Sequence, residues 1–172
     1  MPANPQPPDR SRRAFLGGRS RPGPPPLRPP WTDEIRLSDA CTRCQACVEA
    51  CPEGILTKGE GGFPAVDFRK GSGECTFCGA CADACPEPVF TDTTDAPWRL
   101  KITIDEGACL PHSGVHCETC RDACEPDAIR FAPRIGGPST PSIDFERCTS
   151  CGACIGVCPS RAMRIAPAEA TR

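Results

Sequence analysis

The stretch Cys41-Thr42-Arg43-Cys44-Gln45-Ala46-Cys47-Val48-Glu49-Ala50-Cys51-Pro52 decides how this 172-residue chain is organised. It places three cysteines at successive steps of three residues, then a fourth cysteine four residues further on, directly followed by proline. Three thiols in such a short loop can bind one small group from several sides, whereas the fourth thiol lies where the chain changes direction. The pattern therefore predicts a compact multi-thiol site that takes its last thiol from another part of the chain.

The same run recurs and divides the chain into four related half-modules. The first group of cysteines reappears 34 residues later at all four positions. The third and fourth groups are related by the same offset at three positions, and only Cys109 is displaced, by five residues, because the loop 110–116 is longer. The four groups are Cys41, Cys44, Cys47 and Cys51; Cys75, Cys78, Cys81 and Cys85; Cys109, Cys117, Cys120 and Cys124; and Cys148, Cys151, Cys154 and Cys158.

Each half-module repeats a local plan of short elements. Alternating apolar and polar residues, as at 101–104 and 142–145, predict short strands ahead of the cysteine loops. An Ala-rich helical turn such as 81–85 follows and is stopped by proline, and a second short strand is expected after it, as at 162–165. We therefore expect an α+β fold of two tandem modules, each built from two half-modules with short strands, short helices and loops. The expected boundaries are a flexible Pro- and Arg-rich arm over 1–34, modules over 35–95 and 96–166, and a tail over 167–172.

Aliphatic residues are scarce. Leu, Ile, Val and Phe together number 27, about 16% of the chain, which is low for a domain held by an aliphatic core alone. The 16 cysteines exceed 9% of the residues, which points to cysteine chemistry as the organising principle. We expect the bound group to contribute to the free energy of folding, so the apo chain should be poorly folded.

The N-terminal residues differ in charge from the rest. Residues 1–30 contain six Arg against one Asp, and ten of the 22 prolines, which is typical of an extended segment. Ser11-Arg12-Arg13 is similar to a twin-arginine export signal, but the apolar stretch after it ends at Leu16, so an export signal is not expected. No apolar run is long enough to span a membrane, and no aromatic or recognition-helix pattern predicts nucleic-acid binding.

The cysteine spacing favours iron-sulfur chemistry over two alternatives. A cubane cluster presents four iron atoms at its corners, and a tight loop can bind three of them. A zinc site uses two C-x2-C pairs separated by a longer spacer, and a disulfide framework requires an oxidising compartment. No Ser-His-Asp arrangement, phosphate loop or dinucleotide fingerprint is present, so we expect no catalytic residues and no substrate site of the chain's own.

The run C-x2-C-x2-C-x3-C-P resembles that of bacterial two-cluster ferredoxins, in which the fourth cysteine binds the other cluster. This resemblance implies four 4Fe-4S clusters, with the third group the least regular because its proline is Pro126. It also implies four ligand sets with no cysteine left over. The first set is Cys41, Cys44, Cys47 and Cys85; the second is Cys75, Cys78, Cys81 and Cys51; the third is Cys109, Cys117, Cys120 and Cys158; the fourth is Cys148, Cys151, Cys154 and Cys124.

Over residues 10–165 the chain is similar to the NapF family of ferredoxin-type proteins of the periplasmic nitrate reductase system. The stretches that carry this resemblance are 11–13 with 18–19, 28–31, 41–44, 61–64 and 117–129. The resemblance implies a cytoplasmic protein that contacts the catalytic subunit of that reductase before export and helps to assemble or reduce its cluster. The alternative is a ferredoxin subunit that only relays electrons to an oxidoreductase from a donor that the sequence does not identify.

Overall fold

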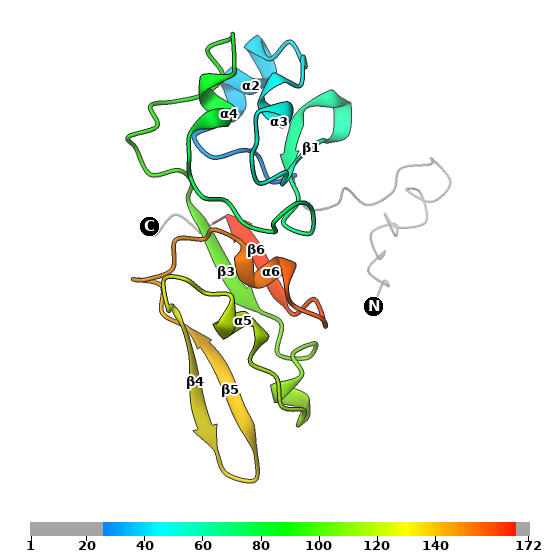
Figure 1. The fold of residues 1–172 in the computed structure, drawn as a ribbon, viewed down its shortest axis with the longest axis vertical. Helices are drawn as coiled ribbons and strands as arrows, with labels where there is room; N and C mark the ends of the chain where they lie inside the picture. Colours follow the sequence, from blue (N-terminus) through cyan, green and yellow to red (C-terminus); the bar gives the residue numbers. More distant parts are fainter. Residues whose placement is uncertain (1–25, 168–172) are drawn as a thin grey trace, which may run out of the picture.

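The computed structural model describes residues 26–167, which form short helices, short strands and long loops in an elongated body (Figure 1). The α-helices are α2 (Glu34–Ala40), α3 (Ala46–Glu49), α4 (Ala80–Asp83), α5 (Thr119–Asp122) and α6 (Ala153–Gly156), and the 3-10 helices are η1 (Glu60–Gly62) and η2 (Pro111–Ser113). The strands are β1 (Leu56–Lys58), β2 (Pro64–Val66), β3 (Leu100–Ile104), β4 (Ile129–Arg134), β5 (Gly137–Ile143) and β6 (Met163–Pro167).

Three of the short helices begin in the same way. The residue before α3, α4 and α6 has left-handed backbone angles and lies between the second and third cysteines of its motif. These residues are Gln45, Gly79 and Gly152, with φ of 69°, 79° and 91°. The turn ends the extended cysteine loop and starts one turn of helix, so the third cysteine faces inward. Cys47, Cys81 and Cys154 are accordingly all buried.

The strands pair in three small antiparallel sheets. β1 pairs with β2, and β4 pairs with β5 in a longer hairpin. β3 pairs with β6 over five residue pairs, from Leu100 with Pro167 to Ile104 with Met163. This pairing joins the beginning and the end of the second half of the chain. In the first half, the corresponding closure is a single bridge between Thr32 and Phe90.

One apolar core crosses the boundary between the two halves of the chain. Ile55 and Phe68 come from the first half, and they pack in one cluster with residues of the second half, among them Ile102, Ile129 and Ile155. A smaller cluster in the first half contains Leu56 with the cysteines Cys47 and Cys81. Buried cysteines therefore belong to both clusters.

The described part of the expected N-terminal arm, residues 26–34, packs against the rest of the molecule. Pro29, Pro30 and Trp31 are buried. The Leu27 carbonyl accepts a hydrogen bond from the Val66 amide at 2.7 Å, and the Trp31 amide donates to the Pro97 carbonyl at 2.6 Å. Residues 26–34 are therefore not a free arm, and residues 1–25 lie outside the described residues. The predicted tail, 167–172, also lies outside them except for Pro167, which ends β6. The module boundaries at 95 and 96 stay a prediction.

Within residues 26–167, none of the helices has the length and apolar character needed to cross a membrane.

Candidate iron-sulfur sites

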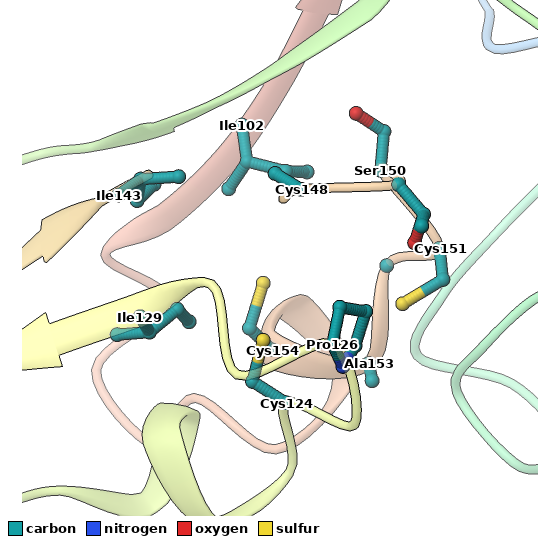
Figure 2. Close-up of a pocket in the computed structure, with 12 residues that line it drawn as sticks. Ile102, Cys124, Pro126, Ile129, Ile143, Cys148, Ser150, Cys151, Ala153 and Cys154 are labelled. Atoms are coloured by element: carbon teal, nitrogen blue, oxygen red, sulfur yellow. The ribbon is translucent and has the colours of Figure 1, made fainter. Parts of the chain in front are cut away.

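The structure gathers the cysteines in the sets that the motif implies. Figure 2 shows the hollow of the fourth set, which is lined by Cys124 together with the loop cysteines Cys148, Cys151 and Cys154. Apolar side chains such as Ile102 line the rest of this hollow. Cys124 belongs to another motif than the three loop cysteines, so two motifs contribute to one site.

Two further hollows have the same construction. Cys51 joins Cys75, Cys78 and Cys81 around the hollow of the second set. Around the hollow of the third set the structure places Cys109, Cys117, Cys120 and Cys158. The three hollows enclose nearly the same empty space, about 340, 350 and 350 Å³ including the part open to solvent. Equal size and equal donor sets fit the same kind of group in each hollow.

The cysteines of the first set are neighbours of its buried member, Cys47, as the pKa of the Cys47 thiol shows. The pKa of the Cys47 thiol is raised to about 11, first by burial and then by the neighbouring thiols of Cys85, Cys41 and Cys44. These are the three partners that the motif implies for Cys47. Cys44 is exposed, as is Cys78 of the second set, so the first two sites approach the protein surface.

Burial makes the other inward-facing thiols difficult to ionise as well. It is the largest cause that raises the pKa of Cys75 and Cys120 to about 11 and that of Cys81 and Cys154 to about 12, and neighbouring thiols add to the rise. Grouped thiolates repel one another, and a cationic core between them removes that repulsion. The donor sets therefore suit a positively charged group that binds four thiolates at once.

The arrangement of the thiols fits a cluster better than a single zinc ion. All sixteen cysteines lie among the described residues and are free thiols there. Within residues 26–167, no three His, Cys, Asp or Glu side chains lie close enough to hold a single metal ion. A tetrahedral zinc site would bring its sulfur atoms to about 3.8 Å from one another, because Zn–S bonds are about 2.3 Å long. Thiols spread around a hollow instead match the corner irons of a cubane.

Two fourth-position cysteines accept hydrogen bonds from backbone amides. The Ala128 amide donates to Cys124 Sγ at 3.3 Å, and the Ala162 amide donates to Cys158 Sγ at 3.2 Å. Burial raises the pKa of the Cys158 thiol, but the amides of Met163 and Ala162 and the Ser160 hydroxyl outweigh it and lower the pKa below its usual value. Such hydrogen bonds stabilise negative charge on sulfur, and in a cluster they tune the reduction potential.

A cationic edge lies beside the first set. The guanidinium of Arg43, which lies between Cys41 and Cys44 in the sequence, stands over the Phe63 ring at 4.5 Å from its centroid, and that of Arg28 is 5.6 Å from the same centroid. The Gln45 amide group holds this arrangement by donating to the Gly62 carbonyl at 2.8 Å. Sequence reasoning did not identify the role of Phe63, because no periodicity links the turn 60–64 to the cysteine loop.

Comparisons with known proteins agree with this geometry. Residues 40–90 match the model of a 4Fe-4S dicluster domain, and residues 115–162 match a second 4Fe-4S dicluster model. The first range includes all eight cysteines of the first two motifs. The second begins after Cys109, which the structure nevertheless places with Cys117, Cys120 and Cys158.

Curated relatives extend the similarity over nearly the whole chain. The ferredoxin-type protein NapF of Escherichia coli (strain K12) is 45% identical over 156 residues, which cover 90% of this chain and 93% of that protein. NapF of Haemophilus influenzae is 46% identical over 138 residues, 80% of this chain and 77% of that protein. The ferredoxin-type protein NapG of H. influenzae is 30% identical and covers 84% of this chain and 60% of its own length.

The motifs and both domain matches show tandem 4Fe-4S ferredoxin domains that carry multiple 4Fe-4S clusters. Ferredoxin-type proteins of this kind are electron carriers rather than catalytic enzymes. With 45% identity over nine tenths of its length, the chain belongs to the NapF family of ferredoxin-type proteins.

Proposed function

We propose that this protein acts in the cytoplasm on the catalytic subunit of the periplasmic nitrate reductase, before that subunit is exported. Direct contact between the two proteins serves to assemble or reduce the iron-sulfur cluster of the subunit. The observation that carries the proposal is the near full-length similarity to NapF proteins, whose name links them to this reductase system. The protein needs no substrate site of its own for this role.

The sixteen cysteines are the proposed ligands of four 4Fe-4S clusters, in the four sets that the resemblance implies; the linings of the three hollows support three of these sets. Bound clusters supply the capacity to take up and release single electrons. The protein chain determines how accessible each cluster site is to a redox partner. Exposed Cys44 brings the first site to the surface, whereas the third site keeps Cys109 buried. The proposed fold class is α+β, with two small modules that each hold two sites.

Positive charge at the first site suits contact with an acidic protein surface. Arg43 is exposed and has no carboxylate partner among the described residues, while Phe63 fixes its position by the cation–π contact. Arg28 is half-buried and paired with Glu34 at 3.1 Å, so it contributes less free charge. We propose the edge formed by Arg43, Phe63 and Cys44 as the side of the protein that approaches its partner.

A second candidate is an electron-transfer subunit that relays electrons to an oxidoreductase without assisting maturation. The similarity to the ferredoxin-type protein NapG supports this alternative. The two functions differ in the partner that must bind and in the state of that partner, so a binding experiment separates them.

The deciding experiment is an anaerobic pull-down of the purified precursor of the nitrate reductase catalytic subunit. The full-length chain is compared with a variant that lacks residues 1–25; the truncation stops there because residues 26–34 pack against the body. Binding of the precursor by the full-length chain supports maturation. If the full-length chain ignores the precursor but rapidly accepts electrons from a physiological donor, the relay function replaces it.

A further inference from the structure

The loops of the second and fourth sets touch each other across the module boundary. The Cys75 amide donates a hydrogen bond to the Cys151 carbonyl at 2.8 Å, although the two residues are 76 positions apart. Both residues belong to cysteine sets, one in each half of the chain.

Glycines in the second half of the chain, which have no side chain, allow Phe68 of the first half to approach closely. A Cβ atom on Gly152 would lie 2.2 Å from two ring carbons of Phe68, and one on Gly156 would lie 2.6 Å from the Phe68 carbonyl oxygen. Phe68 comes from the first half of the chain and is 3% exposed. Its ring therefore occupies the space that a side chain on Gly152 would need, so this part of the first half packs directly against the fourth loop.

Aromatic rings extend the contact back to the second set. The Phe68 ring stands edge-on to Trp98 with 6.0 Å between centroids, and Trp98 stands edge-on to Phe77 at 5.6 Å. Phe77 lies between Cys75 and Cys78 in the sequence of the second loop. Three aromatic rings, Phe68, Trp98 and Phe77, thus connect the fourth loop to the second loop.

The sets within each half are also neighbours. Cys47 of the first set and Cys81 of the second lie in one buried cluster, and Cys120 of the third set packs against the cluster that contains Cys154 of the fourth. Three junctions therefore connect four sets. They follow the elongated body, in which the helices of the first half lie toward one end and the β4–β5 hairpin lies at the other (Figure 1).

We propose that the contact between Cys75 and Cys151 joins the two modules into one electron path, so that the four sites form a single series in the order first, second, fourth, third. Clusters held by these four cysteine sets would each take up and release one electron, with no bond formed or broken and no proton transferred. A one-electron donor would reduce one end of the series, and an acceptor would oxidise the other. The inference rests on the occupancy of the sites by clusters, which belongs to the proposed function. It places the two ends at the exposed edge of Cys44 and at the third set.

The test measures magnetic coupling between sites in the isolated, anaerobically reconstituted full chain after reduction with dithionite. An outer-deleted variant, Cys41→Ala/Cys44→Ala/Cys109→Ala/Cys117→Ala, keeps only the second and fourth sets, which belong to different modules. An inner-deleted control, Cys75→Ala/Cys78→Ala/Cys148→Ala/Cys151→Ala, keeps only the first and third. Each should retain about eight irons per chain. We expect a broadened, spin-coupled electron paramagnetic resonance spectrum from the outer-deleted variant and two isolated signals from the control.

Isolated signals from an outer-deleted variant that carries eight irons overturn the series. If that variant binds fewer irons, the double variant Cys41→Ala/Cys44→Ala, which removes only the first set, decides between a series and independent modules. In a series, the second set then remains coupled to the fourth, whereas independent modules leave one isolated spin per chain. Because no partner protein takes part, failure of this test leaves the maturation proposal intact, and failure of the pull-down leaves the series intact.

Discussion

Gly152→Ala tests the junction between the modules, and Gly79→Ala is its matched control. Both glycines lie between the second and third cysteines of their motifs and have left-handed backbone angles, with φ of 91° and 79°. Nothing lies within 4 Å of a Cβ placed on Gly79, whereas one on Gly152 would overlap the Phe68 ring. The pair therefore shares the backbone cost and differs in the contact.

The expected magnitudes follow from these two terms. Left-handed backbone angles cost an alanine roughly 1–2 kcal/mol in either variant. Overpacking against Phe68 should add about 1–3 kcal/mol to Gly152→Ala alone. For a chain of this size that difference lowers the apparent Tm by roughly 2–12 °C relative to Gly79→Ala. The motif tolerates a side chain at this position, because Gln45 takes it in the first loop with φ of 69°.

The assay is anaerobic thermal unfolding of the reconstituted proteins, followed by circular dichroism and by the visible absorbance of the clusters. The double variant Gly152→Ala/Phe68→Leu should recover part of the loss relative to the sum of its single variants, since a smaller side chain at 68 relieves the overlap. Equal stability losses in Gly152→Ala and Gly79→Ala would refute the reasoning, because the shared backbone cost would then explain both.

Three other predictions concern the sites directly. Arg43→Gln should lower the reduction potential of the first site, because a fixed positive charge favours the reduced, more negative state. Spectroelectrochemical titration measures the shift, with Arg134→Gln, which changes an exposed arginine near the hairpin tip, as the control. Identical titration curves for the two variants contradict the prediction. Cys109→Ala should reduce the iron content from about sixteen to about twelve per chain, and retention of sixteen by elemental analysis would remove Cys109 from the ligands. Thiols such as Cys154, with a pKa of about 12, are protonated at pH 7, so cluster assembly should release protons and should become faster as the pH rises from 7 to 9. In the apo protein the pKa of these thiols is raised above its unfolded value of 9.0. The stability that the neutral thiols contribute is therefore complete below pH 9 and is lost as the pH rises through 11 to 12. Stopped-flow reconstitution with a pH indicator measures that release, and assembly without proton uptake by the buffer would count against it.

The cysteine sets were the most predictable feature of this protein. Spacing alone indicated three thiols per loop, and the resemblance to two-cluster ferredoxins implied the exchange of the fourth cysteine. In three hollows the fourth cysteine lies with the loop cysteines of the other motif, whereas its role as a ligand stays a prediction. Alternating residues likewise predicted the strands at 101–104 and 162–165, close to β3 and β6 as observed. These features depend on the local sequence or on the repeat, so they can be predicted from the order of the residues alone.

The contact between Cys75 and Cys151 could not be predicted in the same way. Two similar repeats predict two similar modules, but nothing in their spacing says which loops meet. The answer depends on the shape of Phe68 and on the space left by Gly152, which is a property of tertiary packing. The same limit applies to residues 26–34, because their composition favours an extended arm, whereas burial of Trp31 and the prolines holds them in place.

The packing of residues 27–31 has a consequence for how the protein is made. On the ribosome these residues are synthesised early, yet Leu27 finds its partner only at Val66, and Trp31 donates to carbonyls at Asp95 and Pro97. The first module therefore closes only after the chain has grown past residue 97, by which time all eight of its cysteines are available. A nascent chain that stops at residue 90 contains the whole dicluster match but lacks the segment that seals it.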